Sequence, residues 1–225
     1  MKKILKKILF GENKVQLHTI KFFAPRGIKL YLNAAIASKT ILGFEEFETQ
    51  SFFVNYSKLC NYFIDIGSSN GYYGVLYKKY NKTGTVYSFE PKEQFWEIQK
   101  KNFEVNHAFH NVTIINKYAA ESDDEKHVNV NLLLPFKSQN IFMKIDIDGG
   151  EVSLINSIKE LLRDNNCFLI VETHGTQLEI DSLLIMKELG YKTQIIDQGW
   201  YRVGILKERR DAIRVGKNRW FIAYK

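Results

Sequence analysis

Two apolar stretches of the sequence end in charged and polar side chains of the kinds that bind substrates and move protons. Lys144, Asp146 and Asp148 alternate along the first stretch, and Glu172 and His174 alternate along the second. Residues two apart in a strand share one face. Burying such groups without partners is costly, so we expect them to face one another, solvent or a ligand.

The chemistry open to these residues is proton removal and substrate orientation. A histidine can act as a general base near neutral pH, and a carboxylate can orient a hydroxyl or an amine. We therefore predict His174 as the base and Asp146 as the orienting carboxylate, with Glu172 and Lys144 as further catalytic candidates. A structural salt bridge between Lys144 and Glu172 explains that pair equally well.

Hard oxygen ligands in the same region offer an alternative. The carboxylates of Asp146, Asp148 and Glu172 could hold magnesium, which prefers oxygen ligands. Their spacing fixes no coordination geometry, so the sequence alone assigns no metal.

A second group of residues lies upstream, around a glycine turn. Asp65 lies in a short apolar run two residues before Gly67, Gly71 follows, and Glu90 ends the next apolar run. Glycines let the backbone approach a ligand without a Cβ in the way, and an acid at the end of the second strand can bind ribose hydroxyls. Strand, glycine turn, helix and acid-ended strand form the first half of a nucleotide-binding unit.

The spacing of this turn favours S-adenosylmethionine as the cofactor. A dinucleotide fingerprint has glycines two residues apart, whereas Ser69 stands midway between Gly67 and Gly71 here. Asp65 suits the ammonium group of a methionine and is awkward beside a pyrophosphate. A nicotinamide dinucleotide, and a turn that binds no ligand, are the alternatives.

The elements that must position both groups alternate between strands and helices. This order predicts an α/β fold with a doubly wound, mostly parallel sheet of seven strands, in which the last strand is inserted antiparallel. A dehydrogenase-type sheet would be parallel throughout. The predicted strands of the sheet are residues 62–66, 86–90, 112–115, 141–148, 167–174, 191–197 and 220–224.

The length of 225 residues suits one substantial core. We predict an N-terminal extension or cap in residues 1–50, laid over the cofactor edge, and a cofactor-binding domain in residues 51–225. Two cysteines, Cys60 and Cys167, form no disulfide framework. Reduced thiols of this kind are typical of a cytoplasmic protein.

The formal net charge is +7, and the basic residues are scattered along the chain, with local concentrations only in residues 2–7 and 207–219. A basic module that binds RNA or a membrane is therefore an alternative of a different class. The sequence lacks the interleaved aromatic and basic residues of an RNA motif, so we expect no specific nucleic acid. Residues 1–10 are too short to span a bilayer. They predict a packing helix, with weak contact to the inner membrane surface as the alternative.

Several motifs resemble the FkbM family of S-adenosylmethionine-dependent methyltransferases. The resemblance covers roughly residues 43–200 and rests on Phe63–Tyr73, Phe89–Pro91, Lys144–Glu151 and Glu172–His174. The glycine turn is common to class I methyltransferases, while the Lys-Ile-Asp-x-x-Gly-x-Glu strand end is more specific to this family. Ser68-Ser69 and Asp148 depart mildly from its usual residues.

The resemblance implies a Rossmann-like fold of the class I methyltransferase type. It also implies O-methylation of a hydroxyl on a sugar, glycoconjugate or secondary metabolite, and the basic C-terminal segment would favour an anionic acceptor. The implied cofactor contacts are Asp65, Gly67, Ser68, Ser69, Asn70 and Gly71 at the methionine, Glu90 and Pro91 at the ribose, Ala119 and Ala120 at the adenine, and Asp146. The acceptor's identity and the oligomeric state are not encoded in these motifs.

Overall fold

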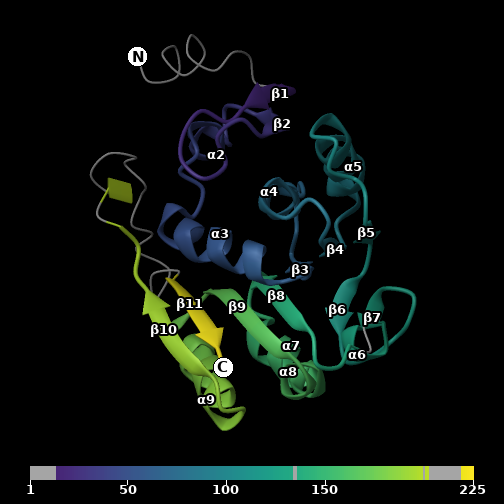
Figure 1. Ribbon diagram of the computed structural model, residues 1–225, viewed down its shortest axis with the longest axis vertical. Coiled ribbons are helices and arrows are strands. Elements are labelled where there is room, and N and C mark those ends of the chain that lie inside the picture. Colours follow the sequence, from purple (N-terminus) through teal and green to yellow (C-terminus); the bar gives the residue numbers. More distant parts are fainter. Residues whose placement is uncertain (1–13, 134–135, 200, 203–218) are drawn as a thin grey trace.

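A twisted sheet of seven strands forms the centre of the protein (Figure 1). The computed structural model describes residues 14–133, 136–199, 201–202 and 219–225. The strands lie in the order β10-β11-β9-β8-β3-β4-β5. Their bounds are β3 (Tyr62–Ile66), β4 (Thr85–Phe89), β5 (Val112–Ile115), β8 (Asn140–Ile145), β9 (Asn166–Thr173), β10 (Lys192–Ile196) and β11 (Arg219–Tyr224).

The strand directions confirm the predicted mostly parallel sheet. Strands β5, β4, β3, β8 and β9 are parallel to one another. Strand β11 lies between β9 and β10 and is antiparallel to both. The expectation of an antiparallel last strand is therefore correct, and an all-parallel, dehydrogenase-type sheet is excluded.

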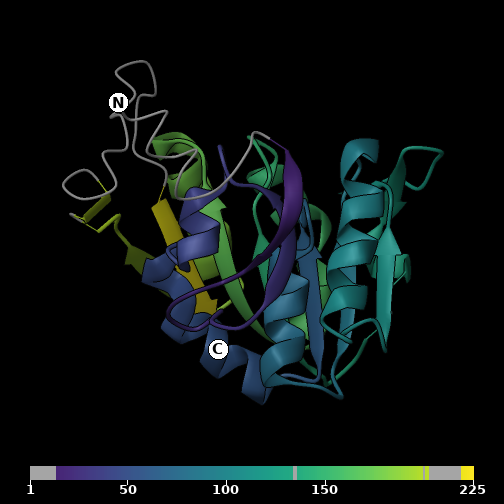
Figure 2. The same cartoon turned by 90° about the horizontal axis from the view of Figure 1, so that it is seen from above.

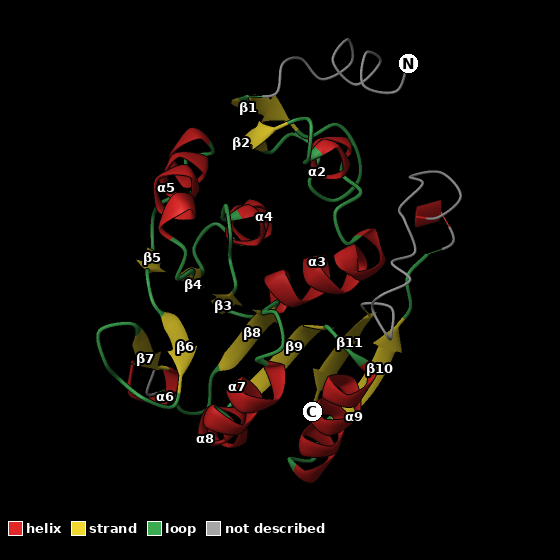
Figure 3. Ribbon diagram, turned by 180° about the vertical axis from the view of Figure 1, so that it is seen from behind, coloured by secondary structure: helices red, strands yellow, loops and turns green. Residues whose placement is uncertain are grey.

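Helices cover both faces of the sheet (Figure 3). One face carries α3 (Gln50–Leu59), α4 (Tyr72–Tyr80) and α5 (Trp96–Val105), and the other carries α7 (Glu151–Ser157), α8 (Lys159–Asp164) and α9 (Thr176–Glu188). Phe63 and Ile64 are both fully buried but belong to separate core clusters, one on each face. The sequence of β3 is a nearly continuous apolar run because both faces of this strand are buried.

The N-terminal part of the chain packs on the side of α4 and α5 (Figure 2). It comprises a hairpin of β1 (Val15–Thr19) and β2 (Lys29–Asn33), then α2 (Ser38–Leu42) and the 3₁₀ helix η1 (Phe47–Thr49). Leu30 and Leu32 join the apolar core of that face. The Tyr31 amide donates to Asn102 Oδ1 at 2.7 Å. The division of the chain at residue 50 stays a prediction.

Local differences from the sequence prediction cluster around the ends of β8 and β5. The fourth core strand ends at Ile145, three residues early, because a turn through Gly149 (φ +82°) follows it. The apolar spacing from Val152 to Leu162 predicts one helix beyond it, but the structure divides this helix at Ile158 into α7 and α8. The polar residues 121–127 predict a loop, and the alternation over residues 128–132 predicts an accessory strand. Instead, β6 (Tyr118–Ala120) pairs with β7 (His127–Asn129), and α6 (Val130–Leu133) follows.

Two predicted segments cannot be compared with the structure, and one finding concerns membrane spans. The terminal helix of residues 1–10 and the basic residues 207–218 lie outside the described residues. Within the described ranges, no helix combines the length and hydropathy needed to cross a bilayer.

Candidate active site

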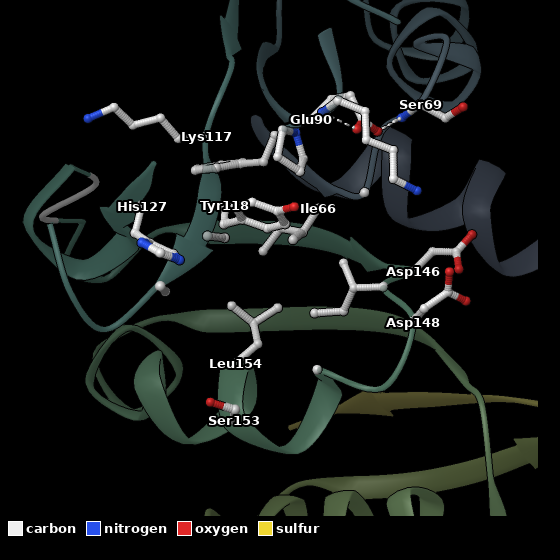
Figure 4. A pocket seen from close by; sticks show the side chains of 18 of the residues that line it. Ile66, Ser69, Glu90, Lys117, Tyr118, His127, Asp146, Asp148, Ser153 and Leu154 are labelled. Atoms are coloured by element: carbon white, nitrogen blue, oxygen red, sulfur yellow. Dashed lines mark hydrogen bonds between the residues drawn. The ribbon is translucent and has the colours of Figure 1, made fainter. Parts of the chain in front are cut away.

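A pocket of about 550 Å³ opens at the carboxyl ends of β3, β4 and β8 (Figure 4). Ligands of open α/β sheets bind at this edge. Most of the predicted cofactor residues line the pocket, and Asp65, Ser68, Asn70 and Gly71 lie outside its wall. The lining residues are Ile66, Gly67, Ser69, Phe89, Glu90, Pro91, Lys92, Phe95, Lys117, Tyr118, Ala119, Ala120, His127, Asp146, Ile147, Asp148, Gly150, Ser153 and Leu154.

Glu90 joins the end of β4 to the glycine turn. Its Oε2 accepts a hydrogen bond from the Ser69 amide, and its Oε1 accepts one from the Lys92 amide, both at 2.8 Å. The side chain is buried at the pocket wall. Each carboxylate oxygen has a second acceptor site, so Glu90 can hold the turn in place and still bind hydroxyls of a ligand.

Gly67 brings the ends of β3 and β8 together. Its φ is +84°, and a Cβ built on it would lie 2.0 Å from the carbonyl oxygen of Asp146. On the same side, the Asp146 amide donates to the Ile66 carbonyl at 3.0 Å. Only glycine fits at position 67, because any Cβ would clash with the Asp146 backbone. The glycine turn and Asp146 therefore lie side by side.

Buried polar side chains of α5 support the turn from behind. Gln99 Nε2 donates to Ser68 Oγ at 2.7 Å and to the Ser69 carbonyl at 2.9 Å. Asn102 Nδ2 donates to the Asn70 carbonyl at 2.9 Å. These contacts place Ser68 and Asn70 in the support of the turn. The sequence prediction missed Gln99 and Asn102, although both are polar residues that the helical pattern turns inward.

Asp65 is buried on the α4 side of β3, next to Lys144 on the neighbouring strand β8. Burial raises the pKa of Asp65 to about 7, although the charge of Lys144 acts in the opposite direction. The structure therefore places this carboxylate under the site, outside the pocket wall.

The far end of the pocket is mainly apolar. Ala119 and Ala120 on β6, Tyr118 beside them and Leu154 on α7 line it, and Phe95 contributes from η2 (Glu93–Phe95). Figure 4 shows the ring of Tyr118 and the side chain of Leu154 on this side, with Asp146 and Asp148 at the opposite end. A flat, apolar base could lie between these surfaces. Tyr118, Phe95 and Leu154 were not predicted, because β6 and the start of α7 were not placed at the pocket.

The predicted catalytic residues form one cluster at the other end. One donor atom from each of Asp146, Glu172 and His174 lies within 4.8 Å of the other two. Lys144 Nζ lies 3.5 Å from Asp146 Oδ2 and 3.1 Å from Glu46 Oε1. Lys144 thus pairs with Asp146 and with Glu46, a partner that the sequence did not indicate.

Lys144 is a buried ammonium group. Burial lowers its pKa, but the charges of Asp146, Glu46 and Glu172 act against burial and raise the pKa overall. Lys144 therefore stays charged between the carboxylates of Asp146 and Glu46. Glu46 precedes η1 with an unusual φ of +37°, so the N-terminal part of the chain reaches the site through this residue.

Glu151 holds His174 in a fixed orientation. Its Oε1 lies 2.7 Å from His174 Nδ1 and accepts a hydrogen bond from the His174 amide at 3.1 Å. Glu151 is fully buried in the first turn of α7, and its hydrogen bond raises the pKa of His174. The other ring nitrogen, Nε2, lies 3.7 Å from Asp146 Oδ1 and 3.5 Å from Asp148 Oδ1. Glu151 was part of the recognised motif but was not predicted as a site residue.

No protein-family model matches the sequence, and no curated protein does. Solved structures do match the fold. An S-adenosylmethionine-dependent O-methyltransferase from Thermotoga maritima superposes with a TM-score of 0.56 at 15% identity, over 97% of this chain and 80% of that one. TYW2 of M. jannaschii in complex with AdoMet gives 0.54 at 14% identity, over 95% and 85%.

Methyltransferase FkbM from Methylobacillus flagellatus is also similar, with a TM-score of 0.56 at 14% identity. The match covers 72% of this chain and 43% of that protein. At such identities the likeness concerns the fold, and membership of the FkbM family stays a prediction. The strand order, the antiparallel seventh strand and these matches together show that the chain has the Rossmann-like fold of the class I methyltransferases.

Proposed function

We propose that this protein is an S-adenosylmethionine-dependent methyltransferase that methylates a hydroxyl group of a sugar, glycoconjugate or secondary metabolite. The observation that carries the proposal is the position of Asp146. This residue lines the pocket and also belongs to the cluster with Glu172 and His174. A cofactor bound in the pocket and an acceptor bound at the cluster would therefore both lie next to the Asp146 carboxylate.

The pocket suits the parts of S-adenosylmethionine. Glu90 offers acceptor atoms for ribose hydroxyls, and the surfaces of Ala119, Ala120 and Leu154 suit an adenine. The turn at Gly67 would face the methionine portion. The likeness to TYW2, solved with AdoMet, supports this assignment, and a volume of about 550 Å³ fits a ligand of this class.

Methyl transfer needs little from the protein beyond placement and proton removal. The methyl group of a sulfonium is already activated, so in-line placement lowers much of the barrier. The acceptor oxygen would supply the electron pair of the new O–CH₃ bond as the S–CH₃ bond breaks. The electron pair of the S–CH₃ bond would stay on sulfur, which leaves S-adenosylhomocysteine. The proton of the acceptor hydroxyl leaves at the cluster of Asp146, Glu172 and His174. The Thermotoga O-methyltransferase with the same fold favours oxygen as the methylated atom.

Calorimetric titration with S-adenosylhomocysteine and with NAD tests the cofactor assignment. We expect the sulfur nucleotide to bind and NAD not to bind. Transfer of a labelled methyl group to nucleotide sugars or polysaccharide fragments tests the acceptor class. Binding of NAD without binding of S-adenosylhomocysteine would overturn the proposal and favour a nicotinamide-dependent enzyme.

A further inference from the structure

We propose that Asp146, Glu172 and His174 bind a divalent transition-metal ion, which holds the acceptor oxygen beside the methyl donor. The binding site is argued from geometry alone, and its role in catalysis rests on the proposed function. The structure changes the ligand set that the sequence offered, because an imidazole replaces the third carboxylate. Asp148, the third carboxylate considered from the sequence, is largely exposed at 82%.

The distances between the three donor groups fit ligands of one ion. Metal bonds to carboxylate oxygen and imidazole nitrogen are about 2.0–2.2 Å long, so two ligands of one ion lie about 3–4.4 Å apart. His174 Nε2 and Asp146 Oδ1 are 3.7 Å apart, and the whole set lies within 4.8 Å. Small inward shifts would bring all three ligands onto one ion. The same 3.7 Å is too long for a hydrogen bond between them.

The orientation of His174 is a second, independent indication. Its Nδ1 is engaged by the buried carboxylate of Glu151 at 2.7 Å. Its other ring nitrogen, Nε2, lies 3.7 Å from Asp146 Oδ1 and 3.5 Å from Asp148 Oδ1. A histidine that binds a metal through one ring nitrogen commonly has the other held by a carboxylate, and His174 has this arrangement.

The two oxygens of Asp146 have different neighbours. Oδ2 faces the ammonium of Lys144 at 3.5 Å, while Oδ1 faces His174. Lys144 thus lies beside one oxygen of the carboxylate, and the other oxygen is left to face an ion. The Asp146 side chain is 35% exposed. An ion bound there could be reached from solvent and would keep an open position for the acceptor.

Two carboxylates and one imidazole indicate the class of metal. Imidazole suits Zn²⁺, Fe²⁺ and similar ions, and carboxylates suit Mn²⁺ and Mg²⁺. The mixed set points to a transition metal, with Mn²⁺ as a suitable probe. A hydroxyl bound to the ion would have a lowered pKa and would release its proton to water before attack on the methyl group. In this scheme His174 is a ligand and not the base that the sequence suggested.

The test measures Mn²⁺ binding to the full chain after treatment with EDTA, by the loss of the free Mn²⁺ signal in electron paramagnetic resonance. We expect one tight site per chain, at least tenfold weaker binding in His174→Ala and Glu172→Gln, and roughly 10–100-fold weaker binding in Glu151→Gln. His110→Ala removes an exposed histidine and should bind Mn²⁺ like the unmutated protein. Circular dichroism checks that each variant is folded, independently of any ligand.

The outcomes separate this inference from the proposed function. Equal Mn²⁺ binding by the unmutated protein and His174→Ala would overturn the metal site. Methyl transfer that is unchanged by EDTA would overturn the role of the ion in catalysis. Either result would leave the methyltransferase proposal standing. Tight Mn²⁺ binding that is lost in His174→Ala supports the metal site. If such a protein bound no S-adenosylhomocysteine, the site would stand and the proposed function would fall.

Discussion

The carbonyl oxygen of Asp146 occupies the place where any side chain at Gly67 would begin, 2.0 Å from the position of its Cβ. The two residues follow the ends of adjacent strands, and the Asp146 amide donates a hydrogen bond to the Ile66 carbonyl. The glycine turn of the pocket and the first residue of the polar cluster are therefore fixed to each other. A displacement of one must move the other.

Gly67→Ala should lower the free energy of unfolding by more than the cost of placing alanine in the left-handed conformation. Gly190 has a similar φ of +78°, but no atom lies within 4 Å of the place that a Cβ would take there. Gly190→Ala therefore carries only the conformational cost, roughly 1–2 kcal/mol. At Gly67 the backbone clash adds to this cost. Urea unfolding of both variants measures the difference, and an equal loss in the two would contradict the close approach of β3 and β8.

Glu90→Ala should weaken the binding of S-adenosylhomocysteine. Each charge-assisted hydrogen bond lost between Glu90 and the ribose hydroxyls costs roughly 1.5–3 kcal/mol of binding free energy. The substitution also removes the acceptor of the Ser69 amide. The exposed Glu93 lies three residues away, so Glu93→Ala is the matched control and should bind normally. Calorimetry measures both affinities. Unchanged binding in Glu90→Ala would exclude Glu90 from the ribose site.

Asp65 should make the stability of the protein depend on pH. Its pKa is raised by burial from 3.8 to about 7 in the folded state, against the charge of Lys144 and with the charges of Asp146 and Glu90. Between these values the folded state binds more protons than the unfolded state. The free energy of unfolding should therefore fall as pH rises through this window, by up to roughly 1.4 kcal/mol per pH unit from this group.

Asp65→Asn removes this contribution. The difference in unfolding free energy between the unmutated protein and this variant, measured in urea from pH 4 to pH 8, should decline with pH up to about 7 and then level off. A difference that grows with pH would mean that Asp65 is ionised and stabilised by Lys144 throughout.

The buried pair of Glu48 and Arg202 should show strong energetic coupling. Arg202 donates two hydrogen bonds to Glu48, at 2.8 and 3.0 Å, and both side chains are 8% exposed. Removing one partner leaves a buried charge and should cost about 3–5 kcal/mol. A double-mutant cycle with Glu48→Gln and Arg202→Met measures the coupling.

The exposed pair of Lys117 and Asp123, 4.0 Å apart, provides the comparison. Exposed pairs of this kind contribute about 0–1 kcal/mol, so Lys117→Met and Asp123→Asn should be nearly additive. Equal coupling energies in the two cycles would show that Glu48 and Arg202 are solvated in solution.

The sequence predicted the features that local patterns determine. The apolar run of β3, the glycine turn and Glu90 lie within thirty residues, and their spacing alone carries the information. The contact between Lys144 and Glu46 joins residues 98 positions apart, and no periodicity reveals such a pair. The orientation of His174 by Glu151 likewise depends on how α7 begins beside the end of β9.

Other errors came from patterns that continue across a structural break. The apolar periodicity runs through Ile158 without interruption, so the division between α7 and α8 was not visible. Alternating residues after Ile145 suggested three more strand residues, but β8 ends there because the chain enters the turn through Gly149. The assignment of Asp65 to the methionine end rests on its spacing to the glycines and stays a prediction, because that spacing does not show on which side of β3 the carboxylate lies.

The place of β11 between β9 and β10 governs the order in which the sheet can be completed. Before Arg219–Tyr224 arrives, β9 has an open edge along the buried run from Leu169 to Val171, and β10 has no partner in the described sheet. Open apolar edges pair readily with other chains. Newly made chains would thus be most prone to aggregate in the interval between synthesis of β9 and docking of β11, which makes this strand decisive for the yield of folded protein.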